Sequence, residues 1–417
     1  MIYFIYILRT DVRHCHFPSN VRGGRPMKRG AVRTDTLTLL TYGFRPFFLG
    51  GAIWAVMAMV LWVGIVAGRI KIDLGLPQIS WHAHEFLFGY VGAIIAGFLL
   101  TAVPNWTGRA PLQGFVLLSL LVLWIAGRVA LLAAGLIGYW VAAFVDVLFL
   151  PSLALFLLRE VRAAGSNANI RIVAVVLVLA LANVLFHTEM IVYGYTTFAG
   201  RGSISLILLL IVLIGGRIVP NFTRNWLVGR GEHRLPASMD GFDHTVIAIS
   251  VASLIMWTFF PSVPLTPLFL LTAGAFHAVR LGRWSGWRTR SEPLVFILHV
   301  GYTFVPFGFL LAGVSLIWPS IVMPSTATHA WTSGAMGTMT LAIMTRATRG
   351  HSGRSLTAPR TTQIVYLCVI LAGVLRLGEA CLPDASMTLY VLSALSWVAA
   401  FSIFLMIYGP MLVLPRR

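Results

Sequence analysis

Two histidines and a glutamate lie together in the stretch WHAHEFLFGY (81–90), which runs directly into a long apolar segment. Lipid penalises ionisable side chains, so those found within apolar segments are candidates for function. Neutral imidazole is a usual ligand of haem iron, copper and zinc. His82 and His84 are two positions apart, about 200° around a helix. We therefore expect them to serve two different centres unless the helix begins later.

Two further histidines are placed at the same membrane level by the topology derived below. His187 lies near the outer end of one predicted span and His329 opens another. At 1.5 Å per residue, these two lie within roughly 10 Å of the membrane face that His82 and His84 also approach. Four imidazoles at one depth can converge as ligands. We predict that they form a metal site, the outer histidine cluster.

Two acidic residues accompany the outer histidine cluster. Glu85 follows His82 by three positions and shares its helix face, where it could orient the imidazole, relay protons or bind the metal. Glu189 follows His187 by two positions. If the site turns over a substrate, Glu85 and Glu189 are the predicted catalytic acids that relay protons.

A second set of histidines and arginines is predicted near the inner face. His277 ends one predicted span and His299 begins the next, so the two lie at similar depth. Two imidazoles can bind one haem from opposite sides, while guanidinium groups bind its carboxylates. The arginines predicted for such contacts are Arg45, Arg217 and Arg280 at the inner level and Arg128 and Arg376 at the outer level.

Each of these residues also has a simpler interpretation. A single interfacial histidine is more often a hydrogen-bonded or snorkelling residue than a metal ligand. The inner arginines are at least as well explained as topology determinants and partners of lipid headgroups. The argument for a metal site therefore depends on the coincidence of four imidazoles at one membrane level.

The elements that must position these residues are transmembrane helices. Hydrophobic residues make up 58% of the 417 positions and charged residues 11%, with a mean hydropathy of +0.86, which excludes an ordinary soluble domain. Windows of about 20 apolar residues predict about twelve spans. They lie near 47–67, 84–103, 113–133, 138–158, 172–192, 204–222, 244–260, 263–282, 294–317, 326–346, 363–380 and 389–413. We predict an all-α polytopic bundle that forms a single membrane domain over residues 36–417.

The net charge of +18 is distributed unevenly along this topology. Arginines concentrate in alternate loops, which is the positive-inside pattern of a protein with both termini in the cytoplasm. A nucleic-acid partner is therefore not needed to explain the charge, and the lipid bilayer is the expected surroundings. Residues 1–35 are predicted to be a disordered extension or an upstream-start artefact, with Met27 a plausible start.

Several motifs together resemble the NnrS family, whose members are bacterial inner-membrane proteins associated with haem, copper and the response to nitric oxide. The motifs are YGFRPFFLGG (42–51), WHAHEFLFGY with AGFLLTAVPNWTG (81–108), LWIAGR (123–128), GGRIVPNFTRN (215–225), HAVRLGRW (277–284) and HAWTSGAMGTMTLAIMTRATRGHSGR (329–354). They occur in order over about residues 40–355. The resemblance implies haem b and copper as cofactors and a role in denitrification or nitrosative stress. It assigns neither individual ligands nor a reaction.

Three functional hypotheses follow. In the first, the outer histidine cluster binds haem and copper and meets nitric oxide, a small uncharged gas that needs no charged substrate pocket. Such a redox protein would require an electron donor, which the sequence does not identify. In the second, the histidines hold a transient ion in a transporter or metal carrier. In the third, the protein binds nitric oxide without turnover, as a scavenger or sensor.

Overall fold

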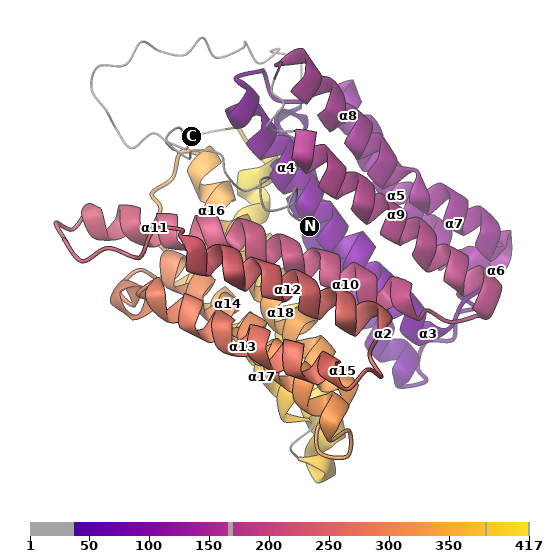
Figure 1. Cartoon of the computed structure of the whole chain (residues 1–417). Coiled ribbons are helices and arrows are strands. Elements are labelled where there is room, and N and C mark those ends of the chain that lie inside the picture. Colours follow the sequence, from indigo (N-terminus) through magenta and orange to yellow (C-terminus); the bar gives the residue numbers. More distant parts are fainter. Residues whose placement is uncertain (1–36, 166–169, 380–381, 416–417) are drawn as a thin grey trace.

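The computed structural model describes residues 37–165, 170–379 and 382–415 (Figure 1). Within these ranges the chain forms helices and short connections, and no residue is in a β-strand. The predicted amino-terminal extension, including Met27, lies outside the described residues. In a bilayer a helix satisfies its own backbone hydrogen bonds, which explains why apolar sequence of this length folds as helix.

Among the described residues, the first half of the chain contains eight α-helices and one π-helical segment, η2. They are α2 (Phe44–Val66), α3 (Gln78–His84), η2 (Glu85–Tyr90), α4 (Val91–Thr107), α5 (Phe115–Leu132), α6 (Ala134–Ile137), α7 (Tyr139–Val147), α8 (Phe149–Ala163) and α9 (Ile170–Tyr193). α3, η2 and α4 follow one another without a break and form one span.

The second half contains two further π-helical segments, η4 and η6. Its elements are α10 (Phe198–Leu210), η4 (Ile211–Gly215), α11 (Gly216–Val228), α12 (Gly241–Phe259), α13 (Leu265–Arg283), α14 (Pro293–Ile317), α15 (Pro324–His329), η6 (Ala330–Met336), α16 (Gly337–His351), α17 (Arg360–Gly378) and α18 (Ser386–Val413). The short 3-10 helices are η1 (Thr38–Leu40), η5 (Gly286–Thr289) and η7 (Pro383–Ala385).

Eleven helical stretches among the described residues are long and apolar enough to cross a membrane. The one predicted span that is not among these eleven is 326–346. It lies in the continuous run of α15, η6 and α16, which is helical but rich in Ser, Thr and Gly. Its side chains are buried against other helices, as Trp331 and Leu341 show with no exposed area. A helix surrounded by protein need not be apolar throughout, so its polarity is consistent with a buried position. The predicted all-α polytopic bundle is confirmed.

The first and last long helices meet at one end of the bundle (Figure 1). Nη1 of Arg45, near the start of α2, donates hydrogen bonds to the carbonyl oxygens of Met411, Leu412 and Leu414 at 3.2, 2.8 and 3.1 Å. These carbonyls belong to the last turn of α18, where a cation is favoured. The start of α2 and the end of α18 therefore lie at the same membrane face. Arg45, which we predicted to contact a cofactor, has this capping role in the structure.

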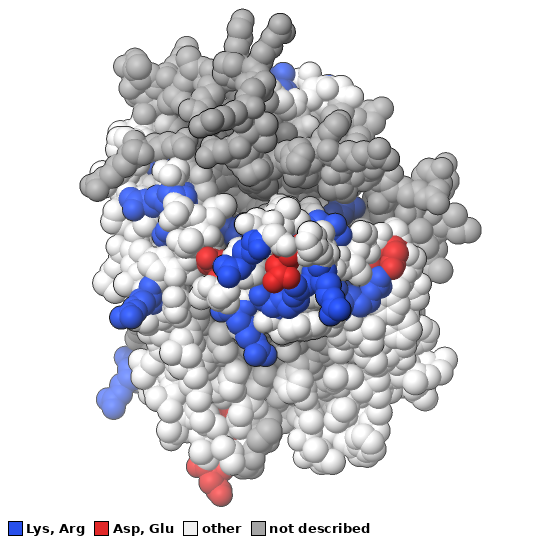
Figure 2. All heavy atoms as spheres, turned by 90° about the vertical axis from the view of Figure 1, so that its left-hand side faces the viewer, with Lys and Arg blue, Asp and Glu red and all other residues white. Residues whose placement is uncertain are grey.

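Basic side chains form a band across the face where α11 ends (Figure 2). The connections after α11 and before α14 contribute many of them, and several acids are paired there: Arg288 with Glu232 and Arg283 with Asp240. Asp240 also caps α12 by accepting hydrogen bonds from Phe242 N and Asp243 N. This face belongs to the predicted inner loops, as the positive-inside rule expects.

The helix that carries the paired histidines begins earlier than predicted. α3 starts at Gln78, directly after Pro77, so His82 and His84 lie inside the helix rather than at its opening. η2 begins at Glu85, one residue after His84, and η6 begins at Ala330, one residue after His329. A π-helical segment changes the direction of the side chains that follow it, and such segments are frequent at functional sites.

Candidate metal centre

Six buried polar residues meet between α3, η2, α5, α7 and α9 at the level of the outer histidines. They are His84, Glu85, Arg128, Asp146, Asn183 and His187. None has more than 4% of its surface exposed. Five of these side chains are ionisable within membrane-spanning helices, which marks the cluster as functional by default.

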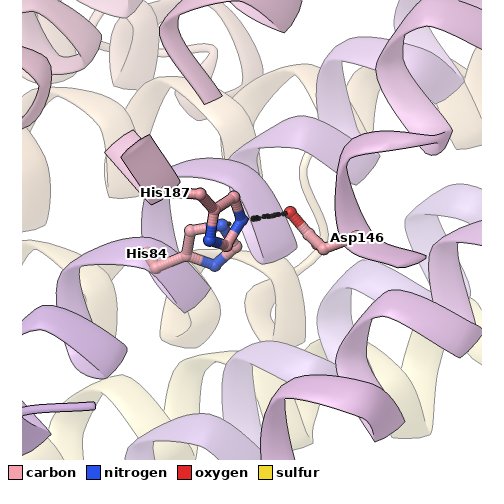
Figure 3. A group of neighbouring side chains, drawn as sticks. All are labelled: His84, Asp146 and His187. Atoms are coloured by element: carbon pink, nitrogen blue, oxygen red, sulfur yellow. Dashed lines mark hydrogen bonds and ion pairs between the residues drawn. The ribbon is translucent and has the colours of Figure 1, made fainter. Parts of the chain in front are cut away.

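Two imidazoles point at one carboxylate oxygen (Figure 3). Nε2 of His84 is 3.2 Å from Oδ2 of Asp146, and Nε2 of His187 is 3.0 Å from the same oxygen. One ligand atom from each of these residues lies within 4.8 Å of the others. With metal–ligand bonds of about 2.0–2.2 Å, neighbouring ligand atoms are about 3–3.5 Å apart. These three residues, the buried triad, therefore have the spacing of a metal site.

The other nitrogen of each imidazole is held by an outer partner. Nδ1 of His84 is 3.1 Å from Oε1 of Glu85, and Nδ1 of His187 is 2.8 Å from the hydroxyl of Tyr139. Metal-binding histidines characteristically donate their second N–H to a carboxylate or another oxygen, which fixes the ring and its tautomer. Both histidines of the buried triad have such a partner.

The cluster contains more negative than positive formal charge. Nη1 of Arg128 donates to both carboxylate oxygens of Glu85 at 2.7 Å, and Nη2 pairs with Asp146. One guanidinium therefore faces two carboxylates, and neutral imidazoles leave a net charge of −1. An uncompensated buried charge is strongly unfavourable. The cluster is completed by one further cation, either a proton on an imidazole or a metal ion.

An amide side chain links the members of the cluster. Nδ2 of Asn183 donates to Oδ2 of Asp146 at 2.8 Å, and its Oδ1 lies 3.0 Å from Nε2 of His84. Asn183 is one helical turn before His187 on α9, so both face the same carboxylate. The amide oxygen is a further potential ligand, because carbonyl oxygens bind many metal ions.

Two glycines allow these polar groups to approach closely. A Cβ atom at Gly89 would lie 2.6 Å from Nη1 of Arg128 and 2.9 Å from Oε2 of Glu85. A Cβ at Gly127 would lie 2.8 Å from Oδ1 of Asp146. Both separations are shorter than a normal contact, so a Cβ atom at either position would displace the polar groups of the cluster.

The structure divides the four outer histidines into two pairs. His84 and His187 belong to the buried triad, with ring centroids 4.8 Å apart. His82 points to the other side of α3, where its ring stacks on Trp62 at 4.3 Å. Nδ1 of His329, on α15, lies 2.7 Å from the carbonyl oxygen of Ser325. His82 and His329, the outer histidine pair, are thus separate from the triad, as the two-residue spacing on one helix requires.

The two predicted proton-relay acids have different surroundings. Glu85 lies in the cluster and pairs with Arg128. The Glu189 carboxylate accepts hydrogen bonds from the backbone N–H groups of Thr197, Phe198 and Ala199 at 2.6, 3.2 and 3.2 Å. It therefore caps the start of α10. The proton-relay role of both acids stays a prediction.

The inner histidines do not face each other. Nε2 of His277 is 2.8 Å from the Ser250 hydroxyl and its Nδ1 is 3.0 Å from the Tyr302 hydroxyl. Nε2 of His299 is 2.7 Å from the hydroxyl of Thr223. Both nitrogens of His277 are thus already used by hydroxyls. Nδ1 of His299 is buried without a hydrogen-bond partner among the described residues. The role of the inner pair as two axial haem ligands stays a prediction.

The remaining predicted arginines lie apart from one another. Nε of Arg280 pairs with Asp243 at 2.8 Å beside His277. Arg376 pairs with Glu379 at the end of α17. Arg217 is exposed on α11. Of the five, Arg128 alone belongs to the buried cluster around the triad.

Three residues of the site were not predicted. Asp146, Asn183 and Tyr139 all contact the triad histidines or belong to the triad. A signal for Asp146 is present in the sequence, because it is the one acid within the apolar run VAAFVDVLFL (141–150). Asn183 and Tyr139 are ordinary residues of membrane helices, and nothing in the sequence sets them apart.

Comparison with known families agrees with the motifs. The family model described as NnrS protein matches residues 38–416, which include every helix from α2 to α18. No curated protein matches the chain. The family match covers both the buried triad and the outer histidine pair. This multi-pass membrane chain belongs to the NnrS family.

Proposed function

We propose that the protein binds copper and haem b in the bacterial inner membrane and handles nitric oxide there, by binding, detoxification or redox conversion. Family membership supports a role in the response to nitric oxide. The observation that carries the proposal is the buried triad, in which two imidazoles and a carboxylate converge with an excess of negative charge.

The donor set of the buried triad fits a redox metal. Two imidazole nitrogens and one carboxylate oxygen suit Cu(II) and other first-row ions, and three protein ligands leave a position open. A bound metal ion would supply that open position to nitric oxide. His84, His187 and Asp146 would hold the ion, with Glu85 and Tyr139 orienting the imidazoles.

The surroundings of the triad favour a small uncharged ligand. The ring of His84 packs against Phe88 and Phe186, with centroids 5.1 and 5.3 Å apart. Both phenylalanines are buried, with 2% or less of their surface exposed. These aromatic walls exclude water, while nitric oxide can reach such a site through lipid and between apolar side chains. Arg128 keeps both carboxylates in place without needing solvent.

Purified protein tests the proposal directly. We expect nitric oxide to change the optical and EPR spectra of the metal-loaded protein. The His84→Ala and His187→Ala variants should lose that response, whereas His233→Ala, on an exposed inner loop, should keep it. Spectra of the metal-loaded wild type that nitric oxide does not alter would refute the proposal.

The same preparation separates the alternatives that the sequence left open. Loss of nitric oxide beyond one molecule per site, in the presence of a reductant, indicates an enzyme. Uptake that stops at one molecule per site indicates a scavenger or sensor. A metal that exchanges rapidly with free ions and moves across the bilayer of a proteoliposome indicates a carrier.

A further inference from the structure

We propose that a groove between α14 and α17 binds one anionic phospholipid from the inner leaflet. The groove uses none of the helices that carry the buried triad, so its occupant is independent of the proposed function. Three features support the proposal. The groove is apolar and open to lipid, it offers no hydrogen-bond partner along its length, and two arginines without carboxylate partners lie beside its inner end.

The groove, which has a volume of about 200 Å³, follows the first turns of both helices. Its walls are residues 293–300 of α14 and 363–370 of α17. Leu367, on the α17 wall, has 55% of its surface exposed, so the groove opens to the surroundings of the bundle. At 1.5 Å per residue it reaches about 10 Å from the helix starts, which is within one leaflet of the bilayer.

The polar side chains that line the groove are turned away from it or lie at its end. The hydroxyl of Tyr366 is 2.7 Å from Oγ1 of Thr345 on α16, which leaves the ring as an apolar wall. Nε2 of Gln363 donates to the carbonyl oxygen of Ala358 at 3.0 Å, before the start of α17. A ligand with polar atoms deep in the groove would leave them unpaired, whereas an acyl chain needs no hydrogen bonds.

One carboxylate joins the two helix starts and closes the inner end of the groove. Oε1 of Glu292 accepts hydrogen bonds from Leu294 N at 3.0 Å and from Ala358 N at 3.1 Å. The hydroxyl of Thr362, on α17, is 2.7 Å from the hydroxyl of Tyr408, near the end of α18. The closed end of the groove therefore lies at the inner face, where α18 ends.

Two arginines give this end an excess of positive charge. Arg290 and Arg360 each lie three residues before a residue that lines the groove, and both are exposed. Neither side chain has an ion pair among the described residues, and the one nearby carboxylate, Glu292, is buried. Guanidinium groups bind phosphate strongly, and basic pockets between membrane helices on the cytoplasmic side bind anionic headgroups. An apolar groove that ends at unpaired arginines is complementary to an anionic phospholipid.

A second groove at the inner face, between α4 and α8, differs in both respects. Its volume is about 10 Å³, and it is lined by Glu160 among apolar residues. Nε of Arg109 pairs with Oε2 of Glu160 at 2.6 Å. The arginine beside this groove is thus neutralised by the chain itself. Room for an acyl chain and unpaired positive charge occur together at the groove between α14 and α17.

Native mass spectrometry of the full-length protein in detergent tests the proposal. Phosphatidylglycerol and phosphatidylcholine with identical acyl chains are offered together. We expect one phosphatidylglycerol per chain to be retained, at least about fivefold more than phosphatidylcholine. The double variant Arg290→Gln with Arg360→Gln should lower phosphatidylglycerol retention at least about fivefold and leave phosphatidylcholine unchanged.

The matched control removes the same charge elsewhere on the inner face. Arg159 and Arg162 are exposed at the end of α8, which lies well apart from α17 (Figure 1). Arg159→Gln with Arg162→Gln should retain phosphatidylglycerol as the wild type does. An equal loss in this control would assign binding to the overall charge and overturn the proposed site.

A second pair of variants tests the groove itself. Val300→Trp fills it, whereas Val279→Trp places the same side chain on an exposed position of α13. We expect both to melt as the wild type does and only Val300→Trp to lose the lipid. Equal retention of both lipids by the wild type, or unchanged retention in the Arg290 and Arg360 variant, would overturn the proposal. A dimer of the chain that excludes lipid from the groove would overturn it as well.

Discussion

Two regions of the bundle each hold a buried arginine, carboxylates and histidines, yet only one of them has an excess of negative charge. In the region of the buried triad, one guanidinium faces two carboxylates and both imidazoles point at a shared oxygen. In the inner region, Arg280 pairs with Asp243, and hydroxyls take both nitrogens of His277.

The difference shows why a buried histidine is not by itself a ligand. In the inner region Arg280 and Arg283 face Asp243 and Asp240, so its charges are balanced within the chain. Nδ1 of His299 and Nη2 of Arg280 are nevertheless buried without hydrogen-bond partners among the described residues. The triad region lacks one positive charge, which either a proton on an imidazole or a metal ion would supply. The triad region differs from the inner region in the convergence of its donor atoms and in its charge balance. Depth in the membrane does not distinguish a region that could bind a metal from one that could not.

Removing the arginine of each region should have the largest effect. Arg128→Met leaves Glu85 and Asp146 without an arginine partner. Arg280→Met removes the nearer of two arginines from Asp243, which keeps Arg283 at 3.6 Å. Breaking a buried pair costs about 3–5 kcal/mol. We expect both variants to unfold at lower temperature in detergent, and we expect added metal to restore only Arg128→Met. Equal rescue of both variants, or of neither, would contradict the difference between the regions.

Neutralising one carboxylate in each region sharpens the contrast. Asp146→Asn removes a ligand together with the excess negative charge, so we expect metal affinity to fall by at least about tenfold, about 1.4 kcal/mol, with little loss of stability. Asp243→Asn should lower stability and leave metal affinity unchanged, because it removes the carboxylate partner of Arg280 and touches no proposed ligand. Competition with a chelator and thermal unfolding measure the two effects. Metal binding that survives in Asp146→Asn would count against the triad.

The close packing around the buried triad can be tested by a substitution at Gly89. Gly89→Ala places a Cβ atom 2.6 Å from Nη1 of Arg128, whereas nothing lies within 4 Å of a Cβ at Gly92. Overpacking of this kind costs about 1–3 kcal/mol. We expect Gly89→Ala to lower both stability and metal content, and Gly92→Ala to change neither. Identical melting curves for the two variants would show that the cluster tolerates displacement.

A hydroxyl in the inner network should have a smaller effect. Ser250→Ala removes the partner of Nε2 of His277, and a lost hydrogen bond costs about 0.5–1.5 kcal/mol. Stability should fall by that amount while metal and haem contents stay at wild-type levels. A drop in haem content in this variant would restore the inner pair as a cofactor site.

The smallest effect is expected at the inner surface. The hydrogen bond from Arg283 lowers the pKa of Asp240 to about 2. A carboxyl with a lowered pKa stabilises the fold above its unfolded value and loses that contribution as pH falls through its folded value. Stability should therefore decline between about pH 4 and 2, less steeply in Asp240→Asn, as unfolding at a series of pH values would show. If the stability of Asp240→Asn fell with pH as steeply as that of the wild type, the decline would have to come from other carboxyl groups.

The fold was more predictable than the site. Apolar windows place the helices because the bilayer fixes their length, and the polar helix from Pro324 to His351 was recognised despite failing a strict hydropathy criterion. The start of α3 was missed by six residues, since Gln78 and Ser80 are polar although they lie within the helix. Sequence alone therefore finds the spans but not where a π-helical segment redirects their side chains.

The site was predictable only in part. Histidine depth identified His84 and His187, and the spacing of His82 and His84 indicated two centres. The side chains that contact each histidine could not be predicted, because they depend on which faces of α5, α7 and α9 meet. Asp146, on α7, completes the triad through that packing. Hydroxyl partners of His277 and His299 were likewise invisible to an argument from depth.

Metal analysis of the purified protein tests the central claim most directly. The account predicts that His84→Ala, Asp146→Ala and His187→Ala each lose the same single ion per chain, whereas His277→Ala and His299→Ala retain the wild-type content. Wild-type metal content in all three triad variants would contradict it.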